Sequence, residues 1–187
     1  RLGAQGGATE ATMLALVVLP FHLTAGYSAV EIGLLMIPWP LATAVAAPIA
    51  GSLSDRYPAG LLGFIGLMMF AAGLAALALL PERAGPIAIA LPMALAGAGF
   101  GLYQSPNNRT IQGSAPRARS GAASGMASVA RLLGQTTGAA FAAFLFSRFP
   151  GNAAIAALWL GAAFATPGAI ASAVRLTDLP PPEGTKV

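Results

Sequence analysis

Residues 60–80 read GLLGFIGLMMFAAGLAALALL, a run of 21 residues without a charged, amide or hydroxyl side chain. An α-helix rises about 1.5 Å per residue, so this run is long enough to cross the roughly 30 Å hydrocarbon layer of a bilayer. In water the same helix would expose apolar side chains on every face. The stretch therefore predicts a transmembrane helix.

Similar apolar stretches occur along the rest of the chain, separated by short clusters of Gly, Pro and charged residues. This spacing is typical of a protein that crosses a membrane several times. We predict an all-α membrane protein, with a six-transmembrane-helix bundle over residues 1–175. The predicted helices are Ala8–Thr24, Val30–Leu53, Gly60–Leu80, a fourth from Pro86 to at least Gln104, Ser120–Ser147 and Asn152–Val174.

Two of these helices and the C-terminal segment have unusual compositions. Ala8–Thr24 has a polar start and the weakest apolar pattern of the set. Val30–Leu53 contains Pro38, Pro40 and Pro48, which predict a kinked helix with some carbonyls left without an intrahelical partner. Residues 176–187 have too little apolar surface to order themselves, and we expect a disordered cytoplasmic tail there.

The overall composition also indicates that lipid surrounds most of the chain. It has 187 residues, of which 56% are hydrophobic and 9% charged, and a mean hydropathy of +0.73. A soluble domain carries roughly 25% charged residues. The chain has no Cys, which excludes thiol ligands, thiol nucleophiles and disulfides within it. Because no His, Ser or carboxylate grouping has catalytic or metal-ligand spacing, we expect neither an enzyme nor a cofactor.

The basic residues predict the orientation of the spans, because Lys and Arg concentrate on the cytoplasmic side of membrane proteins. With an even number of spans, both termini lie on one side. That side holds Arg1, Arg56, Arg109, Arg117, Arg119, Arg175 and Lys186, and the other side holds Arg83 and Arg148. This asymmetry predicts a multi-pass protein of the cell (inner) membrane with both ends of this segment in the cytoplasm. It also explains the net charge of +4 without a nucleic-acid partner.

Small residues are spaced for close contact between helices, since residues four apart lie on one helix face. The pairs are Gly97 with Gly101, Gly121 with Gly125, and Gly134 with Gly138. Small side chains let backbones approach where lipid removes the hydrophobic drive for association. The pairs predict a bundle but no particular contact.

The connection after the second predicted helix reads GSLSDRYPAG over residues 51–60. It resembles the glycine, aspartate and arginine loop signature of the major facilitator superfamily. On this resemblance, Gly51 allows two helices to cross closely, while Asp55 accepts from backbone N–H groups or sits at a neighbouring helix N-terminus. Asp55 and Arg56 then form a latch that holds one conformation and breaks for the other. The alternative is a solvated turn with an ordinary charge pair.

A second resemblance rests on residues 97–109 (GAGFGLYQSPNNR), 114–126 (SAPRARSGAASGM) and 130–135 (ARLLGQ). These segments are similar to the C-terminal half of the fourteen-span drug/proton antiporter family within that superfamily. The resemblance implies a three-plus-three inverted repeat. It also implies an N-terminal half of six or eight helices that builds the other wall of the pathway. We therefore expect the sequence to be part of something longer, or to pair with another protein.

Arg131 is a charged residue inside the fifth predicted helix. A charge at that depth costs at least about 2.5 kcal/mol on insertion scales, so it should face protein or water. Ser124, Ser128, Arg131, Gln135 and Gly138 follow one another at helical spacing and form one stripe. We predict that this stripe lines the substrate cavity or a gate. The alternative is that Arg131 extends toward the lipid headgroups while the stripe packs against a neighbour.

A polar and aromatic cluster occupies the end of the fourth predicted helix, where Pro106 interrupts it. The cluster consists of Tyr103, Gln104, Asn107 and Asn108. Such groups can hydrogen-bond a substrate or hold the cytoplasmic gate closed. The alternative is that Tyr103 lies at the membrane interface on a polar helix end and has no role in transport.

Four further residues complete the candidates. Trp39 is suited to stack on an aromatic or cationic substrate, or it belongs to the aromatic belt at the membrane interface. Glu10, His22 and Glu31 lie near helix ends, where solvation is the simpler role. Proton antiport needs a titratable group reachable from both sides, and the acid for it is predicted to lie in the other half.

These features together predict a secondary active transporter that exports a small hydrophobic or cationic molecule by alternating access and is coupled to protons. Its expected partners are membrane lipid, the substrate, protons and the other half. A metabolite or sugar exporter is an alternative within transport. A non-transporting membrane subunit or fragment that binds a partner is the alternative outside it.

Overall fold

The computed structural model describes residues 27–81, 84–113, 120–149 and 151–174. Within these ranges, every regular element is an α-helix. The helices are α2 (Ala29–Met36), α3 (Pro38–Leu53), α4 (Ala59–Ala78), α5 (Pro86–Gly113), α6 (Ser120–Arg148) and α7 (Ala153–Val174). The predicted all-α fold is confirmed. The predicted helix Ala8–Thr24 and the predicted tail 176–187 lie outside the described residues.

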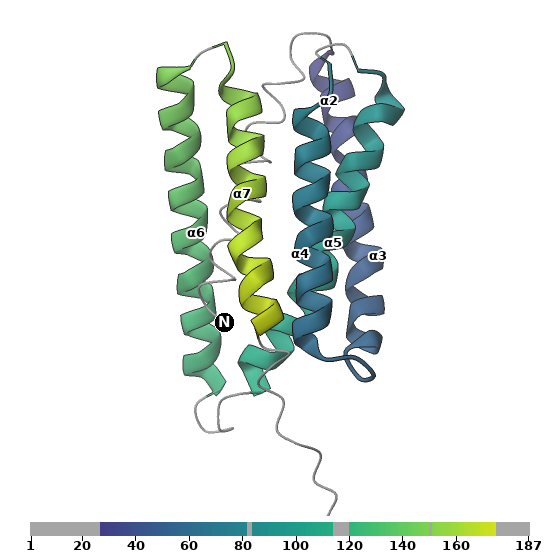
Figure 1. Ribbon diagram of the computed structural model, residues 1–187, viewed down its shortest axis with the longest axis vertical. Coiled ribbons are helices and arrows are strands. Elements are labelled where there is room, and N and C mark those ends of the chain that lie inside the picture. The colour runs from purple at the N-terminus through teal and green to yellow at the C-terminus, as the bar shows by residue number, and fades with distance from the viewer. Residues whose placement is uncertain (1–26, 82–83, 114–119, 150, 175–187) are drawn as a thin grey trace, which may run out of the picture.

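Five segments of the described chain are long and apolar enough to cross a membrane. They are Val30–Leu53, Ala59–Ala78, Pro86–Ile111, Ser124–Arg148 and Ala153–Ile170. They coincide with the second to sixth predicted helices, and Figure 1 shows them as a bundle whose successive members run in opposite directions. The chain is therefore a multi-pass membrane protein.

The second predicted helix is divided at Ile37 into α2 and α3. Pro38 has no N–H to donate to Leu34, and its ring collides with that carbonyl, so the helix cannot continue unbroken. The amide of Ile37 donates instead to Leu34 O at 3.2 Å. α2 begins with a capping box, in which Ser28 and Glu31 each accept from the other's backbone N–H. Glu31 therefore has a structural role at the start of α2.

The fourth predicted helix continues through Pro106 and ends at Gly113. The prediction that Pro106 interrupts this helix is wrong. A proline removes one backbone hydrogen bond, and a bundle tolerates this when neighbours re-satisfy the freed groups. The freed group is the Leu102 carbonyl, and α5 packs tightly against α4 at this level, since a Cβ at Gly66 would lie 3.2 Å from the Leu102 carbonyl carbon. This contact with α4 holds the helix in place past the proline.

The core lies along α4, which packs against α5 on one side and α7 on the other, while α3 packs along α5 (Figure 1). Its centre is filled by Phe70, whose ring meets the Trp39 ring edge-on at 5.6 Å between centroids. Leu67 and Leu74 of α4 are fully buried beside it. In lipid, no hydrophobic effect drives helices together, because exposing an apolar side chain to lipid tails carries no penalty. Interdigitated packing of this kind holds them together instead.

Glycines bring the backbones of α3, α4 and α5 into direct contact. A Cβ added at Gly97 would lie 2.3 Å from the Trp39 carbonyl oxygen, and one at Gly101 would lie 2.9 Å from the Thr43 carbonyl oxygen. On the adjoining face, a Cβ at Gly99 would lie 2.5 Å from the Gly66 carbonyl oxygen. Any larger residue would push these helices apart, so the spacing of Gly97 and Gly101 sets the contact of α5 with α3.

α6 lies at the side of the bundle, next to α7 (Figure 1). Their packing is concentrated in the second half of α6, where Ala142 meets Ala157 in a small apolar cluster. Phe141 reaches Phe164 of α7 at 5.6 Å between ring centroids. The first half of α6 is more open, since a Cβ at Gly121 or Gly125 would meet nothing within 4 Å.

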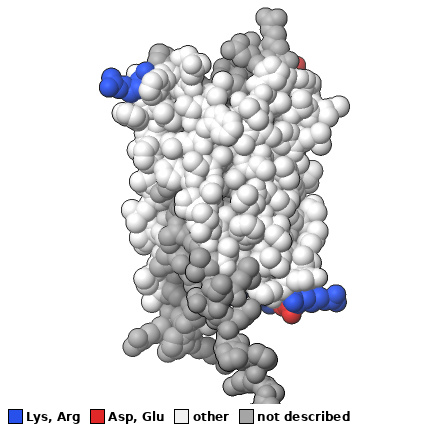
Figure 2. Space-filling view, in the orientation of Figure 1, with Lys and Arg blue, Asp and Glu red and all other residues white. Residues whose placement is uncertain are grey.

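Charged side chains mark the two ends of the bundle. On the face shown in Figure 2, basic and acidic groups appear at the top and the bottom, and the described residues visible between them are uncharged. One end holds the α3–α4 loop and the C-terminal ends of α5 and α7, and we name it the α3–α4 end. Such an uncharged band is what a hydrocarbon layer of about 30 Å requires.

Candidate functional site

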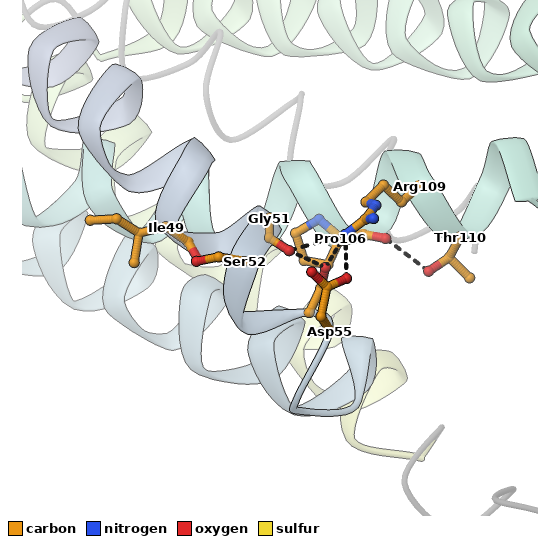
Figure 3. A network of polar contacts seen from close by, with 8 residues as sticks. Ile49, Gly51, Ser52, Asp55, Pro106, Arg109 and Thr110 are labelled. Atoms are coloured by element: carbon orange, nitrogen blue, oxygen red, sulfur yellow. Dashed lines mark hydrogen bonds and ion pairs between the residues drawn. The ribbon is translucent and has the colours of Figure 1, made fainter.

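The guanidinium of Arg109 joins α5 to the end of α3. Its Nη1 donates to the Gly51 carbonyl at 3.0 Å, to Ser54 Oγ at 2.7 Å and to Asp55 Oδ1 at 3.1 Å. Figure 3 shows these contacts between the two helices at the α3–α4 end. We name Gly51, Ser54, Asp55 and Arg109 the clasp.

The local structure explains why a cation sits at this point. The last carbonyls of a helix lack intrahelical partners and carry the negative end of the helix dipole. Gly51 supplies such a carbonyl, and Asp55 follows in the turn after α3. Because Arg109 and Asp55 are 59% and 67% exposed, water screens their attraction, and such a pair adds at most about 1 kcal/mol to stability. The clasp therefore holds two helices together weakly enough to be broken.

The clasp differs from the predicted latch in its partner. Asp55 pairs with Arg109, 54 positions away, whereas the neighbouring Arg56 is exposed and has no partner among the described residues. A Cβ at Gly51 would make one ordinary contact, 3.7 Å from Ser105 Oγ. Gly51 thus contributes its carbonyl and does not permit a close crossing, contrary to expectation. Arg109 was missed as a site residue because no sequence spacing links it to the loop.

The predicted cluster on α5 divides between two faces. Tyr103 and Asn107 are one turn apart and are buried, at 2% and 4% exposure. Gln104 and Asn108 are partly exposed. The inward pair faces the region where α4 and α7 meet, because a Cβ at Gly63 would lie 3.7 Å from the Tyr103 ring and 2.7 Å from Ser172 Oγ.

Two buried polar side chains at this junction have no hydrogen-bond partner in the part of the chain that the structure describes. They are Asn107, through both amide atoms, and Ser172, through its hydroxyl. Leaving a buried polar group unpaired costs about 1–3 kcal/mol. The junction of α4, α5 and α7 at the α3–α4 end is therefore a weak point of the packing.

Replacement of Asn107 by leucine is expected to raise the thermal unfolding midpoint of the purified protein. The two side chains have the same branching and the same number of heavy atoms, and the change removes unpaired amide atoms from a buried site, worth about 1–3 kcal/mol. Asn108→Leu, a half-buried neighbour, serves as control and is expected to change the midpoint little. A lower midpoint for Asn107→Leu would mean that the amide has a partner in the folded protein.

Trp39 lies in the core, at 5% exposure, and packs against Phe70. Its position is at the start of α3, between α4 and α5. The ring is thus covered by protein and does not lie at a lipid-facing surface, as membership of an aromatic belt would require. Trp159, in contrast, is 46% exposed on α7.

The predicted stripe on α6 changes from buried to open along its length. Gly138 is buried, Gln135 and Ser128 are half-buried, and Arg131 and Ser124 are exposed. Arg131 has no hydrogen-bond or ion-pair partner among the described residues. The part of the stripe nearer the α3–α4 end is therefore open to a ligand or to further protein.

The chemistry available in these groups is hydrogen bonding and ion pairing. The clasp joins a cation, an anion and two neutral acceptors, and the junction groups are a neutral amide and a hydroxyl. In the ranges given above, no three His, Asp or Glu side chains are grouped so that they could hold a metal ion. Contacts of this kind form and break without covalent change, as a conformational switch requires.

Comparison with known proteins adds the family. The model of the Major Facilitator Superfamily matches residues 5–187. The chain is 54% identical over 170 residues to the "Uncharacterized transporter YebQ" of Escherichia coli. The aligned segment covers 90% of this chain and 37% of that protein. It is 30% identical over 126 residues to the "Multidrug resistance protein Stp" of Mycobacterium tuberculosis, and that alignment covers 67% of this chain and 23% of that protein.

A third relative is the "Riboflavin transporter RibZ" of Clostridioides difficile, 29% identical over 133 residues, or 70% of this chain and 29% of that protein. The chain thus spans less than two fifths of the length of the curated relatives it matches. Since the family model covers nearly the whole chain, and the described residues form a bundle of membrane-spanning helices, this chain belongs to the Major Facilitator Superfamily of membrane transporters.

Proposed function

We propose that this chain is the C-terminal six-helix half of a fourteen-span exporter that works by alternating access. The clasp is the observation that carries the proposal. It ties the end of α3 to α5 through one guanidinium and three acceptors. A rocking of helices at this end has to break these contacts, and their exposure keeps the cost of breaking them low.

The other wall of the pathway is a second set of six or eight helices. The size of the relatives supports this part of the proposal, because each is more than twice as long as the segment it shares with this chain. Transporters of this architecture place the substrate between two bundles near the bilayer midplane. The open stripe on α6 is a surface that such a second bundle and a substrate could share.

The α3–α4 end faces the cytoplasm of the cell in this proposal, with both ends of the segment on that side of the inner membrane. The clasp arginine and Arg56 lie at this end, and Arg117 and Arg119 follow α5 in the sequence. The opposite end carries Arg148 at the close of α6. An excess of Arg near short loops is the feature that fixes orientation.

The cargo is a small hydrophobic molecule, exchanged for protons. Relatives named for multidrug resistance support this class of cargo. A metabolite exporter is the second candidate, because one relative is named a riboflavin transporter. The described spans carry no acid within their central part, so the coupling carboxylate belongs to the second bundle.

Everted membrane vesicles from cells that express the natural gene test the proposal. We expect at least one of three lipophilic dyes, the neutral Nile red, the anionic fluorescein or the cationic ethidium, to accumulate in them several-fold above vesicles from cells with an empty vector, and a protonophore to abolish the difference. Vesicles that take up riboflavin but no dye would favour the metabolite exporter. Vesicles that hold the protein but take up neither riboflavin nor any of the dyes would contradict transport and favour a non-transporting subunit.

The same vesicles report the orientation once any Cys outside this sequence has been replaced, because the chain has no Cys of its own. Tyr57→Cys lies in the exposed α3–α4 turn and Gly151→Cys between α6 and α7. A membrane-impermeant maleimide is expected to label Tyr57→Cys in everted vesicles and Gly151→Cys in intact cells. The reverse pattern would overturn the orientation.

A further inference from the structure

Arg131 differs from every other charged residue that the structure describes. Glu31, Asp55, Arg56, Arg109 and Arg148 lie in turns or within about one turn of a helix end. Arg131 lies well inside α6, in the segment Ser124–Arg148 that is apolar enough to span the membrane. A lone guanidinium at this depth costs at least about 2.5 kcal/mol unless water, backbone or an anion satisfies it.

The direction of Arg131 follows from helix geometry. Gly138 and Ala142 come seven and eleven residues after it, which places all three on one face of α6. Both are buried against the bundle. Leu133 and Phe144 lie roughly half a turn away round the helix, and they are 62% and 56% exposed. Arg131 is therefore on the bundle side of α6, opposite the apolar face that suits lipid.

Two further donors flank the guanidinium on this face. Ser128 precedes Arg131 by three residues and Gln135 follows it by four, and both are half-buried. None of the three has a hydrogen-bond partner among the described residues. The helix surface thus presents a cation between a hydroxyl and an amide, and all three can donate.

We propose that Arg131, with Ser128 and Gln135, binds an anionic group of the substrate, so that the cargo is a lipophilic organic acid. This inference rests on the proposed transport function and narrows its substrate class. The guanidinium fork matches the two oxygens of a carboxylate, and such charge-assisted pairs are strongest away from water. The described spans hold this cation and no central carboxylate, so they would repel a cationic cargo.

A pair of dyes on the same xanthene ring tests the inference by binding alone. Fluorescein is an anion and tetramethylrhodamine methyl ester is a cation. Fluorescence anisotropy with the detergent-purified product of the natural gene gives an affinity for each. We expect the wild type to prefer fluorescein, and Arg131→Gln to weaken fluorescein binding about tenfold or more while the cationic dye binds equally well or better.

Two variants sharpen the result. Arg131→Lys keeps the charge but loses the fork, so its affinity for fluorescein should fall between those of the wild type and Arg131→Gln. Arg148→Gln removes the same charge from the end of the same helix and should leave both affinities unchanged. A loss confined to fluorescein also rules out a general failure to fold.

Other outcomes overturn the inference. If Arg131→Gln weakens both dyes and lowers the unfolding midpoint, Arg131 pairs with a carboxylate of the protein. If it changes neither affinity, or if the wild type prefers the cationic dye, the stripe does not bind an anion. If binding follows the expected pattern but everted vesicles transport nothing, the exporter function fails while the anion site stands.

Discussion

Replacing Gly97 by alanine is expected to destabilise the bundle by about 1–3 kcal/mol or more. The new Cβ would lie 2.3 Å from the Trp39 carbonyl oxygen and 3.0 Å from the Trp39 Cα and carbonyl carbon. These are backbone atoms of α3, so no rotamer change can relieve the collision. Forcing extra volume into a packed interior costs about 1–3 kcal/mol, and sometimes more.

The measurement is the thermal unfolding midpoint of the purified protein, together with the amount that reaches the membrane. Both should fall for Gly97→Ala. Gly33→Ala is the matched control, because a Cβ there meets nothing within 4 Å. Since alanine favours a helix over glycine by about 1 kcal/mol, the control should be neutral or slightly stabilising. Equal midpoints for Gly97→Ala and wild type would mean that α3 and α5 do not approach as closely as described.

Replacing Arg109 by glutamine is expected to reduce transport about fivefold while lowering the unfolding midpoint by only a few degrees. The change removes all three contacts of the clasp. Exposed contacts contribute little to folding because water replaces them in the unfolded chain. A loss of about 1 kcal/mol from one of two conformations nevertheless shifts their ratio about fivefold.

Arg56→Gln is the control for this variant, since Arg56 is an exposed arginine in the same turn without a described partner. Its transport should match the wild type, and Asp55→Asn should resemble Arg109→Gln. The readout is dye uptake by everted vesicles, corrected for the amount of protein. A defect in Arg56→Gln as large as that in Arg109→Gln would favour the latch of Asp55 with Arg56.

The fold class and most helix boundaries could be predicted from local sequence. Residues 60–80 predicted a helix that the structure gives as Ala59–Ala78, and Ser120–Ser147 became Ser120–Arg148. This works because the hydrocarbon layer imposes one length and one polarity on every span. Proline was harder to interpret. Pro38 ended a helix while Pro106 did not, since the outcome depends on how closely neighbouring helices pack against the chain at the proline.

The candidate site could be predicted only in part. Asp55 and Gly51 were recognised from a short motif, and the α6 stripe from its spacing. The stripe is a property of one helix, so periodicity was enough to place its members on one face. Arg109 could not be predicted as the partner of Asp55, because this depends on how α5 lies against α3. For the same reason, the sequence did not show that Tyr103 and Asn107 are buried. Gln104 and Asn108 are partly exposed instead.

By itself, the sequence determined that this protein crosses a membrane several times, where most of the described spans begin and end, and which residues share a helix face. These properties follow from interactions within a few turns of one helix and with the surrounding solvent. The tertiary structure alone decided that Arg109 meets Asp55, that Gly97 touches Trp39, and that Arg131 faces the bundle. Each depends on contacts between segments distant in the chain, and these are set by the packing of whole helices and not by local pattern.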